Sequence, residues 1–129
     1  PFLQYVALAG PRGEVVRVQA LLDDGAMANI MDEAAWQRVA HRLQPLSVST
    51  RTFRMADGRV VRSRGSWTGL ITFGGVVRRG SFEVFSSGGA WSFLFGKPLL
   101  CAFDVLHDYG MDHDWVVVRD GGRTVRLFN

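Results

Sequence analysis

Two adjacent aspartates, Asp23 and Asp24, are the residues of this sequence best placed to do chemistry. They end an apolar run, in the order Leu21-Leu22-Asp23-Asp24-Gly25-Ala26. Acids at the end of a buried strand are unfavourable unless they are paired or used. Carboxylates that share one proton can act as base and acid on a bound water. The following glycine lets backbone approach the Asp23 carboxylate with no side chain between them.

The other polar clusters fit ordinary structure better than chemistry. The most metal-like group is His107, Asp108, Asp112, His113 and Asp114, but its spacing matches no zinc or calcium loop, so we interpret it as solvated turn residues. No serine stands in a glycine-framed nucleophile turn, and no glycine pair precedes the lysine and hydroxyl residue of a phosphate-binding loop. We expect neither a metal nor an organic cofactor.

The elements that must position Asp23 are mostly short strands. Phe2 to Ala9 and Glu14 to Leu22 are strand-like on either side of the turn residues 10–13, which predicts a hairpin. Further β-prone runs, separated by glycine-rich turns, are Ser49 to Met55, Val60 to Ser63, Ser66 to Phe73, Val76 to Phe85 and Trp91 to Phe95. This spacing favours an all-β barrel or sandwich over alternating strands and helices.

Two short helices and a last hairpin complete the expected fold. Asp32 can cap a helix over about Glu33 to Arg42, because one helical face carries Trp36, Val39, Ala40 and Leu43. A second short helix can begin at Pro98 and run to Phe103. Trp115 to Val118 and Thr124 to Phe128, with a turn between them, predict a hairpin.

The composition favours a single domain over residues 1–129 that pairs with a partner. The apolar fraction is 47% and the mean hydropathy is +0.07, which suggests that another chain covers some apolar surface. A start at Pro1 without a methionine suggests a fragment of something longer. We expect no membrane association, because no apolar stretch approaches the roughly 20 residues of a membrane span.

The cysteine and arginine content bears on the cellular compartment and on nucleic acid as a partner. Cys101 is the only cysteine and lies in an apolar run, so we expect a buried thiol, no disulfide and an intracellular, cytoplasmic protein. The net charge of +3 comes almost wholly from arginines that are scattered along the chain. Scattered arginines make nucleic acid an unlikely partner.

The ordered motifs together resemble those of retropepsin-like aspartic proteases, the retroviral and retrotransposon type. The run from Leu21 to Ala26 is similar to the catalytic loop, with Asp24 in place of the family's serine or threonine. Residues 53–61 resemble the flap hairpin, and residues 82–85 resemble the strand that follows it. Ser92 to Lys97 resembles the apolar-apolar-glycine segment beside the catalytic loop, and residues 107–118 resemble a returning strand.

This resemblance implies a closed all-β barrel with a flap hairpin and a homodimeric acid endopeptidase. Asp23 would be the catalytic residue, with its mate supplied by a second copy because the chain has one such run. Asp24, Gly25 and Ala26 would support the site. Extended peptides or a polyprotein would contact Met27, Asn29, Arg54, Met55, Ala56, Asp57 and Gly58. Strands for a dimer sheet would come from Phe2 to Tyr5 and Val125 to Phe128. The alternative is an inactive retropepsin-like module that dimerises or binds peptides.

Asp24 separates these two alternatives. In the family a hydroxyl at this position donates a hydrogen bond to the partner chain, and an ionised carboxylate cannot donate. A dimer would bring four carboxylates together, so at least one extra proton should be retained. Our hypothesis is that Asp24 acts as a protonated donor, which would make dimerisation and activity favour acid pH.

Overall fold

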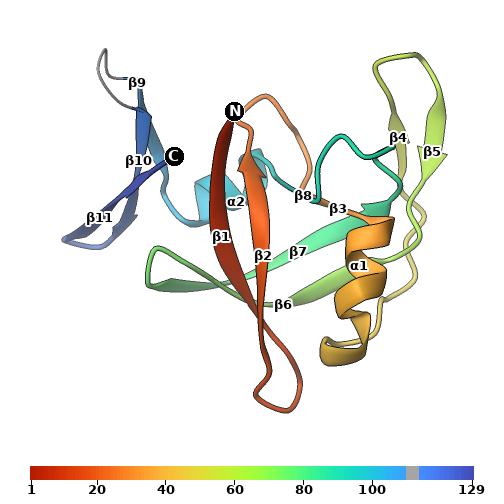
Figure 1. Ribbon diagram of the computed structural model, residues 1–129, viewed down its shortest axis with the longest axis horizontal. Helices are drawn as coiled ribbons and strands as arrows, with labels where there is room; N and C mark the ends of the chain where they lie inside the picture. The colour runs from red at the N-terminus through yellow and green to blue at the C-terminus, as the bar shows by residue number, and fades with distance from the viewer. Residues whose placement is uncertain (110–113) are drawn as a thin grey trace.

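The main body of the computed structural model, which describes residues 1–109 and 114–129, is a barrel of short strands (Figure 1). Within these residues the barrel closes in the order β1-β2-β8-β3-β7-β6. Its strands are β1 (Phe2–Ala9), β2 (Val15–Leu22), β3 (Ile30–Asp32), β6 (Ser66–Phe73), β7 (Val76–Phe85) and β8 (Phe93–Phe95). The predicted all-β closed barrel is confirmed.

Two long hairpins form most of the barrel wall. Strands β1 and β2 pair from Phe2 opposite Leu22 onward, and β6 pairs with β7 from Phe73 opposite Val76. The turn between β6 and β7 is Gly74-Gly75, and both glycines have the positive φ that side chains disfavour. The sequence predicted both hairpins, because turn residues interrupt the β-prone runs at these points.

Strand β8 lies between β2 and β3 and thereby fixes where the chain goes after β2. It runs parallel to β2, with Phe95 opposite Leu22, and antiparallel to β3, with Leu94 opposite Ile30. The loop of residues 23–29 therefore leaves β2 on one side of β8 and returns along β3 on the other. A segment far away in the sequence holds both ends of the loop that carries Asp23.

Both expected helices are present. Helix α1 (Glu33–Val39) continues into a 3-10 turn at Ala40–Arg42, and α2 (Lys97–Ala102) follows β8. The Asp32 carboxylate caps α1 by accepting a hydrogen bond of 3.2 Å from the Ala34 backbone N–H. This cap is the one that the sequence predicted.

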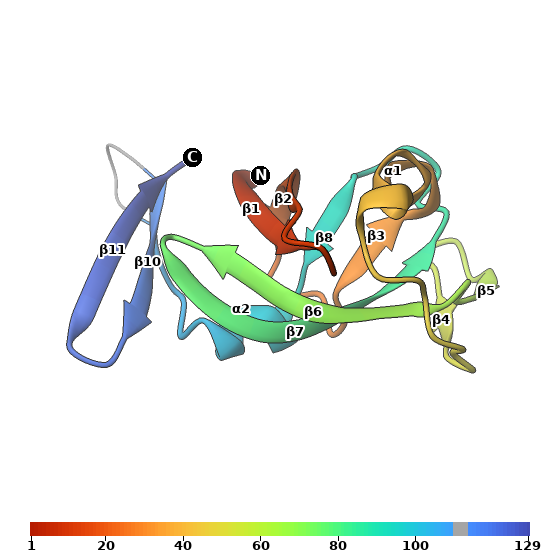
Figure 2. The same cartoon turned by 90° about the horizontal axis from the view of Figure 1, so that it is seen from below.

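Two small sheets project from opposite ends of the barrel (Figure 2). One is the hairpin of β4 (Thr52–Arg54) and β5 (Val60–Arg62), which is the expected flap. The other has the order β11-β10-β9 and contains β9 (Leu106–Tyr109), β10 (Asp114–Asp120) and β11 (Arg123–Phe128).

The expectation of one returning strand over residues 107–118 is wrong. Strands β9 and β10 pair antiparallel, with Asp108 opposite Trp115, so the chain reverses between them. The run Leu106–Tyr109 is too short for its alternation to identify a separate strand from sequence. The expected last hairpin is confirmed as β10 and β11.

The barrel interior is filled by aromatic rings. The rings of Trp67 and Phe82 stack with their centres 5.0 Å apart, and the ring of Trp36 in α1 meets Phe82 edge-on with a centre-to-centre distance of 6.1 Å. Cys101, expected in this core, is exposed instead. It lies two residues from both Leu99 and Phe103, so it faces away from the helical side that these two residues bury.

Candidate functional site

Asp23 is held in place by backbone hydrogen bonds on three sides. Its N–H donates to the Phe95 carbonyl at 3.0 Å, and its carbonyl accepts from the Ala26 N–H at 3.2 Å. Its carboxylate oxygen Oδ1 accepts from the Gly25 N–H at 2.9 Å. The residue is half-buried, the bond from Gly25 orients its carboxylate, and no described residue donates a hydrogen bond to the other oxygen, Oδ2.

Two glycines allow this close packing. A Cβ at Gly25 would lie 3.2 Å from Asp23 Oδ1, so the expected close approach of backbone to carboxylate is confirmed. At Gly96 the constraint is much more severe, because a Cβ there would lie 2.2 Å from the Ala28 carbonyl oxygen. Backbone atoms cannot yield as a flexible side chain can, and Gly96 is therefore needed for β8 to pass beside the loop.

Asn29 supports the loop from within the protein. The side chain is 8% exposed, and its Nδ2 donates to the Ser81 carbonyl at 3.0 Å. Its Oδ1 accepts from the Gly96 N–H at 3.0 Å and the Leu99 N–H at 3.4 Å. We expected Asn29 to contact substrate, but its side chain is buried and its hydrogen bonds connect the loop to β7 and α2.

Asp24 lies beside Asp23 on one hollow of the surface, and neither aspartate lines the separate groove between the loop and the flap that is described next. Asp24 is exposed, and its carboxylate forms no hydrogen bond or ion pair with any described residue. Together with Asp23 it lines a hollow of about 610 Å³ whose wall includes Phe2, Leu22 and Lys97. Exposed Cys101 of α2 lines the same hollow.

A second hollow of about 390 Å³ lies between the loop and the flap. Ala26 and Met27 form its loop side, and Arg54, Met55 and Ala56 form part of its flap side. These five residues were predicted to support the site or contact substrate, and the fold brings them together. Met27 is 74% exposed, which leaves its side chain available to a ligand.

Two predicted flap residues stay outside this groove. Asp57 binds the Arg59 side chain at 2.7 Å and accepts the Arg59 backbone N–H at 3.0 Å. The backbone bond, with the guanidinium, lowers the pKa of Asp57 below its ordinary value. Gly58 has a φ of 88° and donates to the Met55 carbonyl at 2.9 Å. Both residues shape the flap turn.

Sequence reasoning missed the far wall of the groove. Phe85 and Trp91 line it beside Phe53, and the Phe53 and Phe85 rings stack at 5.1 Å. Arg51 also lines the groove, with its guanidinium 5.0 Å from the centre of the Phe53 ring. These residues come from separate runs, and only the sheet pairing brings them together.

The described residues of the group that we interpreted as solvated turn residues lie in strands instead, with His107 and Asp108 in β9 and Asp114 in β10. His107 and Asp114 pair through Nε2 and Oδ1 at 2.6 Å, whereas Asp108 accepts from the Trp115 indole at 2.7 Å. The remaining members, Asp112 and His113, lie outside the described residues. Among residues 1–109 and 114–129, no group of three or more potential ligands could hold a metal ion.

Comparison with known proteins gives the fold class. The chain is similar to the retroviral protease-like domain of Ddi1 from Leishmania major, with a TM-score of 0.61 and 18% sequence identity. The match covers 98% of this chain and 95% of that one. No protein-family model and no curated protein matches the sequence. The fold is therefore retropepsin-like, and the loop that carries Asp23 lies within that fold. In the described part of the chain, no helix is long and apolar enough to span a membrane.

Proposed function

We propose that the chain is a homodimeric aspartic endopeptidase that cleaves extended peptides. The observation that carries the proposal is the Asp23 carboxylate, which is fixed by the Gly25 N–H at 2.9 Å at the end of a strand in a retropepsin-like barrel. The apolar groove beside the loop supports it, since an extended peptide needs such pockets for alternate side chains.

The chemistry requires a second carboxylate. With two aspartates sharing one proton, the ionised one takes a proton from water while the protonated one donates to the peptide carbonyl. The water oxygen attacks the carbonyl carbon. The aspartate that took the water proton then passes it to the peptide nitrogen, the C–N bond breaks to release the amine, and the proton on the former carbonyl oxygen returns to the other aspartate. We propose that Asp23 of a second copy is the mate, and that this copy covers the hollow lined by Phe2, Leu22 and the two aspartates.

A peptide library incubated with the protein at pH 4 to 7, beside the Asp23→Asn variant, tests the proposal. We expect cleavage by the parent chain and none by the variant, because the amide cannot act as the base. Light scattering at increasing protein concentration should show a dimer for both. Cleavage by the Asp23→Asn variant, or no cleavage by the parent chain at any pH, would refute the proposed endopeptidase activity.

The second candidate is an inactive module that dimerises or binds peptides. It is favoured by Asp24, which stands where the fold's enzymes have a hydroxyl donor and which no described residue contacts through a hydrogen bond. Binding of library peptides without cleavage would support this candidate.

A further inference from the structure

The groove between the loop and the flap is positively charged and has no acidic residue in its wall. Of the described residues that line it, Arg51 and Arg54 are charged, and the others are apolar or small. A groove of this composition offers apolar surface along its length and positive charge at its flap side.

The Arg51 guanidinium sits at the end of a row of aromatic rings. It lies 5.0 Å from the centre of the Phe53 ring, Phe53 stacks on Phe85 at 5.1 Å, and Trp91 meets Phe85 edge-on at 6.1 Å. A guanidinium over an aromatic face is held by the ring's quadrupole, and its N–H groups stay free to bind a carboxylate.

The backbone of Arg51 is anchored on both sides. Its N–H donates to Ser49 Oγ at 3.3 Å, and its carbonyl accepts from the Ser63 N–H at 2.9 Å. The Ser49 hydroxyl also donates to the buried Glu83 carboxylate. Arg51 is therefore placed by the barrel, and it does not depend on the flap turn for its position.

Arg51 and Arg54 differ from Arg59 and Arg64 in having no acidic partner among the described residues. Arg59 pairs with Asp57 at 2.7 Å, and Arg64 pairs with Glu33 at 3.4 Å. Within the described part of the chain, neither Arg51 nor Arg54 forms an ion pair, and Arg54 reaches only the Gly58 carbonyl at 3.5 Å. No described residue thus neutralises the charge of the groove.

We infer that the groove selects peptides that carry an acidic side chain beside an apolar one, and that Arg51 is the residue that binds the acidic side chain. The apolar side chain packs on the wall of Phe53, Phe85 and Trp91, and the carboxylate binds the guanidinium above it. This inference rests on the proposed function, because it names the substrate class of the same groove.

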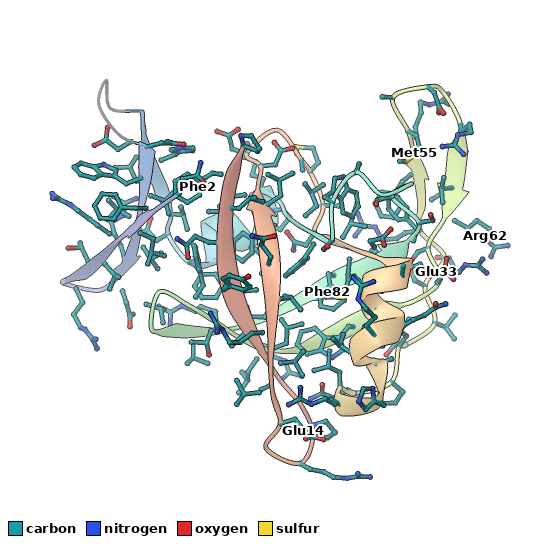
Figure 3. All side chains as sticks on the ribbon, in the orientation of Figure 1. Phe2, Glu14, Glu33, Met55, Arg62 and Phe82 are labelled. Carbon is teal, nitrogen blue, oxygen red and sulfur yellow. The ribbon has the colours of Figure 1, made fainter. Side chains whose placement is uncertain are left out.

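The hairpin offers a matched control in Arg62. Figure 3 shows Met55 on the barrel side of the hairpin and Arg62 on its outer side. Arg62 is exposed, forms no ion pair with a described residue, and lines a separate hollow beside Glu33. Removing its charge changes the net charge of the hairpin as much as removing that of Arg51 does.

The test measures binding in a chain that cannot cleave. The probes are labelled short peptides with a central Leu or Phe and with Glu, Gln or Lys beside it. Their binding is measured by fluorescence anisotropy as the Asp23→Asn protein is added. The same measurement is made with Asp23→Asn combined with R51Q, R51E or R62Q. We expect the Glu peptides to bind about three- to fivefold tighter than the Gln peptides at low salt. R51Q should remove this preference, R51E should transfer it to Lys peptides, and R62Q should keep it.

The outcomes separate the inference from the enzyme. Equal binding of Glu and Gln peptides, no binding of either, or an equal loss with R51Q and R62Q overturns the inference. If the parent chain cleaves peptides but shows no preference for acidic ones, the inference about the groove is wrong and the proposed endopeptidase activity is supported. If Asp23→Asn binds acidic peptides more tightly and the parent chain cleaves no peptide, the proposed endopeptidase activity is wrong and the inference about the groove is supported.

Discussion

At the scale of single residues, Gly96 constrains the site more than any side chain does. A methyl group there would meet the Ala28 carbonyl oxygen at 2.2 Å, so the backbone of β8 or the loop would have to move. The Asp23 N–H bond to Phe95 and the Asn29 bond to the Gly96 N–H lie within the same few residues. The position of the Asp23 carboxylate therefore depends on a missing side chain about seventy residues away.

We predict that Gly96→Ala lowers the free energy of unfolding by about 1–3 kcal/mol, the usual effect of forcing extra volume into a packed region. Peptide cleavage should fall by a larger factor, since the loop shifts with β8. Urea unfolding and initial rates check this. Gly122→Ala is the matched control, because nothing lies within 4 Å of a Cβ there. Equal effects of the two substitutions would contradict the prediction.

Asp24 gives a second prediction at this scale. If it works as a protonated donor in the dimer, Asp24→Thr supplies a permanent hydroxyl donor and removes the need for the proton. The dimer affinity of Asp24→Thr should then exceed that of the parent at pH ~7.5 and approach it at pH ~5. Sedimentation at both pH values measures this. No gain at the higher pH would rule out the protonated donor.

At the scale of elements, Asp32 links α1 to the turn after β7. Its Oδ2 accepts from the Ala34 N–H at 3.2 Å, and its Oδ1 accepts from the Ser87 N–H at 2.8 Å. Burial alone would raise the pKa of Asp32, but the hydrogen bonds from Ser87, Ala35 and Ala34 outweigh burial and lower it. The ionised carboxylate is therefore the form that stabilises the fold.

A lowered pKa means that this stabilisation is present above the unfolded value and is lost as the pH falls through the folded value. Asp32→Asn keeps a single acceptor oxygen and therefore loses either the cap on α1 or the bond from Ser87, so it should be less stable than the parent at pH 7 by about 1 kcal/mol. The difference should begin to shrink as the pH falls below about 4, the ordinary aspartate pKa of the unfolded chain, and should vanish only below the lowered folded pKa, where the parent's carboxylate is also protonated. Urea unfolding at both pH values checks this, and a constant difference would contradict it.

The flap is joined to the barrel through Ser49. Its hydroxyl donates to Glu83, which is 5% exposed, and accepts from the Arg51 N–H. Ser49→Ala removes this partner from the buried carboxylate and should lower stability by about 1–3 kcal/mol. Ser47→Ala is the control, because Ser47 is exposed and pairs with Ser66 through backbone atoms. Equal urea midpoints for the two variants would show that the bond to Glu83 contributes little.

Local patterns predicted the elements well where turn residues interrupt strands. The β6–β7 hairpin and the Asp32 cap could be read from sequence because neighbouring residues determine both. The burial of Asn29, the bond of Ser49 to Glu83 and the aromatic wall of Phe85 and Trp91 could not. Each of these depends on which strands pair, and strand pairing joins residues with no sequence signal in common.

At the scale of the whole molecule, the end of the chain fastens the β9–β11 sheet to the barrel. Asn129 Oδ1 accepts from the Leu3 N–H at 2.9 Å, and its Nδ2 donates to the Pro1 carbonyl at 2.7 Å. Gln4 Nε2 also donates to the Phe128 carbonyl at 2.6 Å. The same region borders the hollow that we propose the second copy covers.

We predict that Asn129→Ala speeds hydrogen exchange at the Leu3 amide by about fivefold, since a net contribution near 1 kcal/mol is usual for one such bond. Asn129→Asp keeps the acceptor and loses only the donor, so it should preserve more of the protection. Exchange monitored by NMR compares the two. The same rate in both variants would argue against a direct role for Oδ1.

The crossing of β8 between β2 and β3 also bears on how the protein is made. Ribosomes release a chain from its N-terminus, and Asp23 emerges long before Phe95, Gly96 and Lys97, the residues whose backbone atoms hold its loop. A nascent chain that ends before these residues has the aspartate but no means of fixing it. The Asp23 carboxylate can therefore reach the position seen in the folded chain only when nearly the whole barrel has been synthesised.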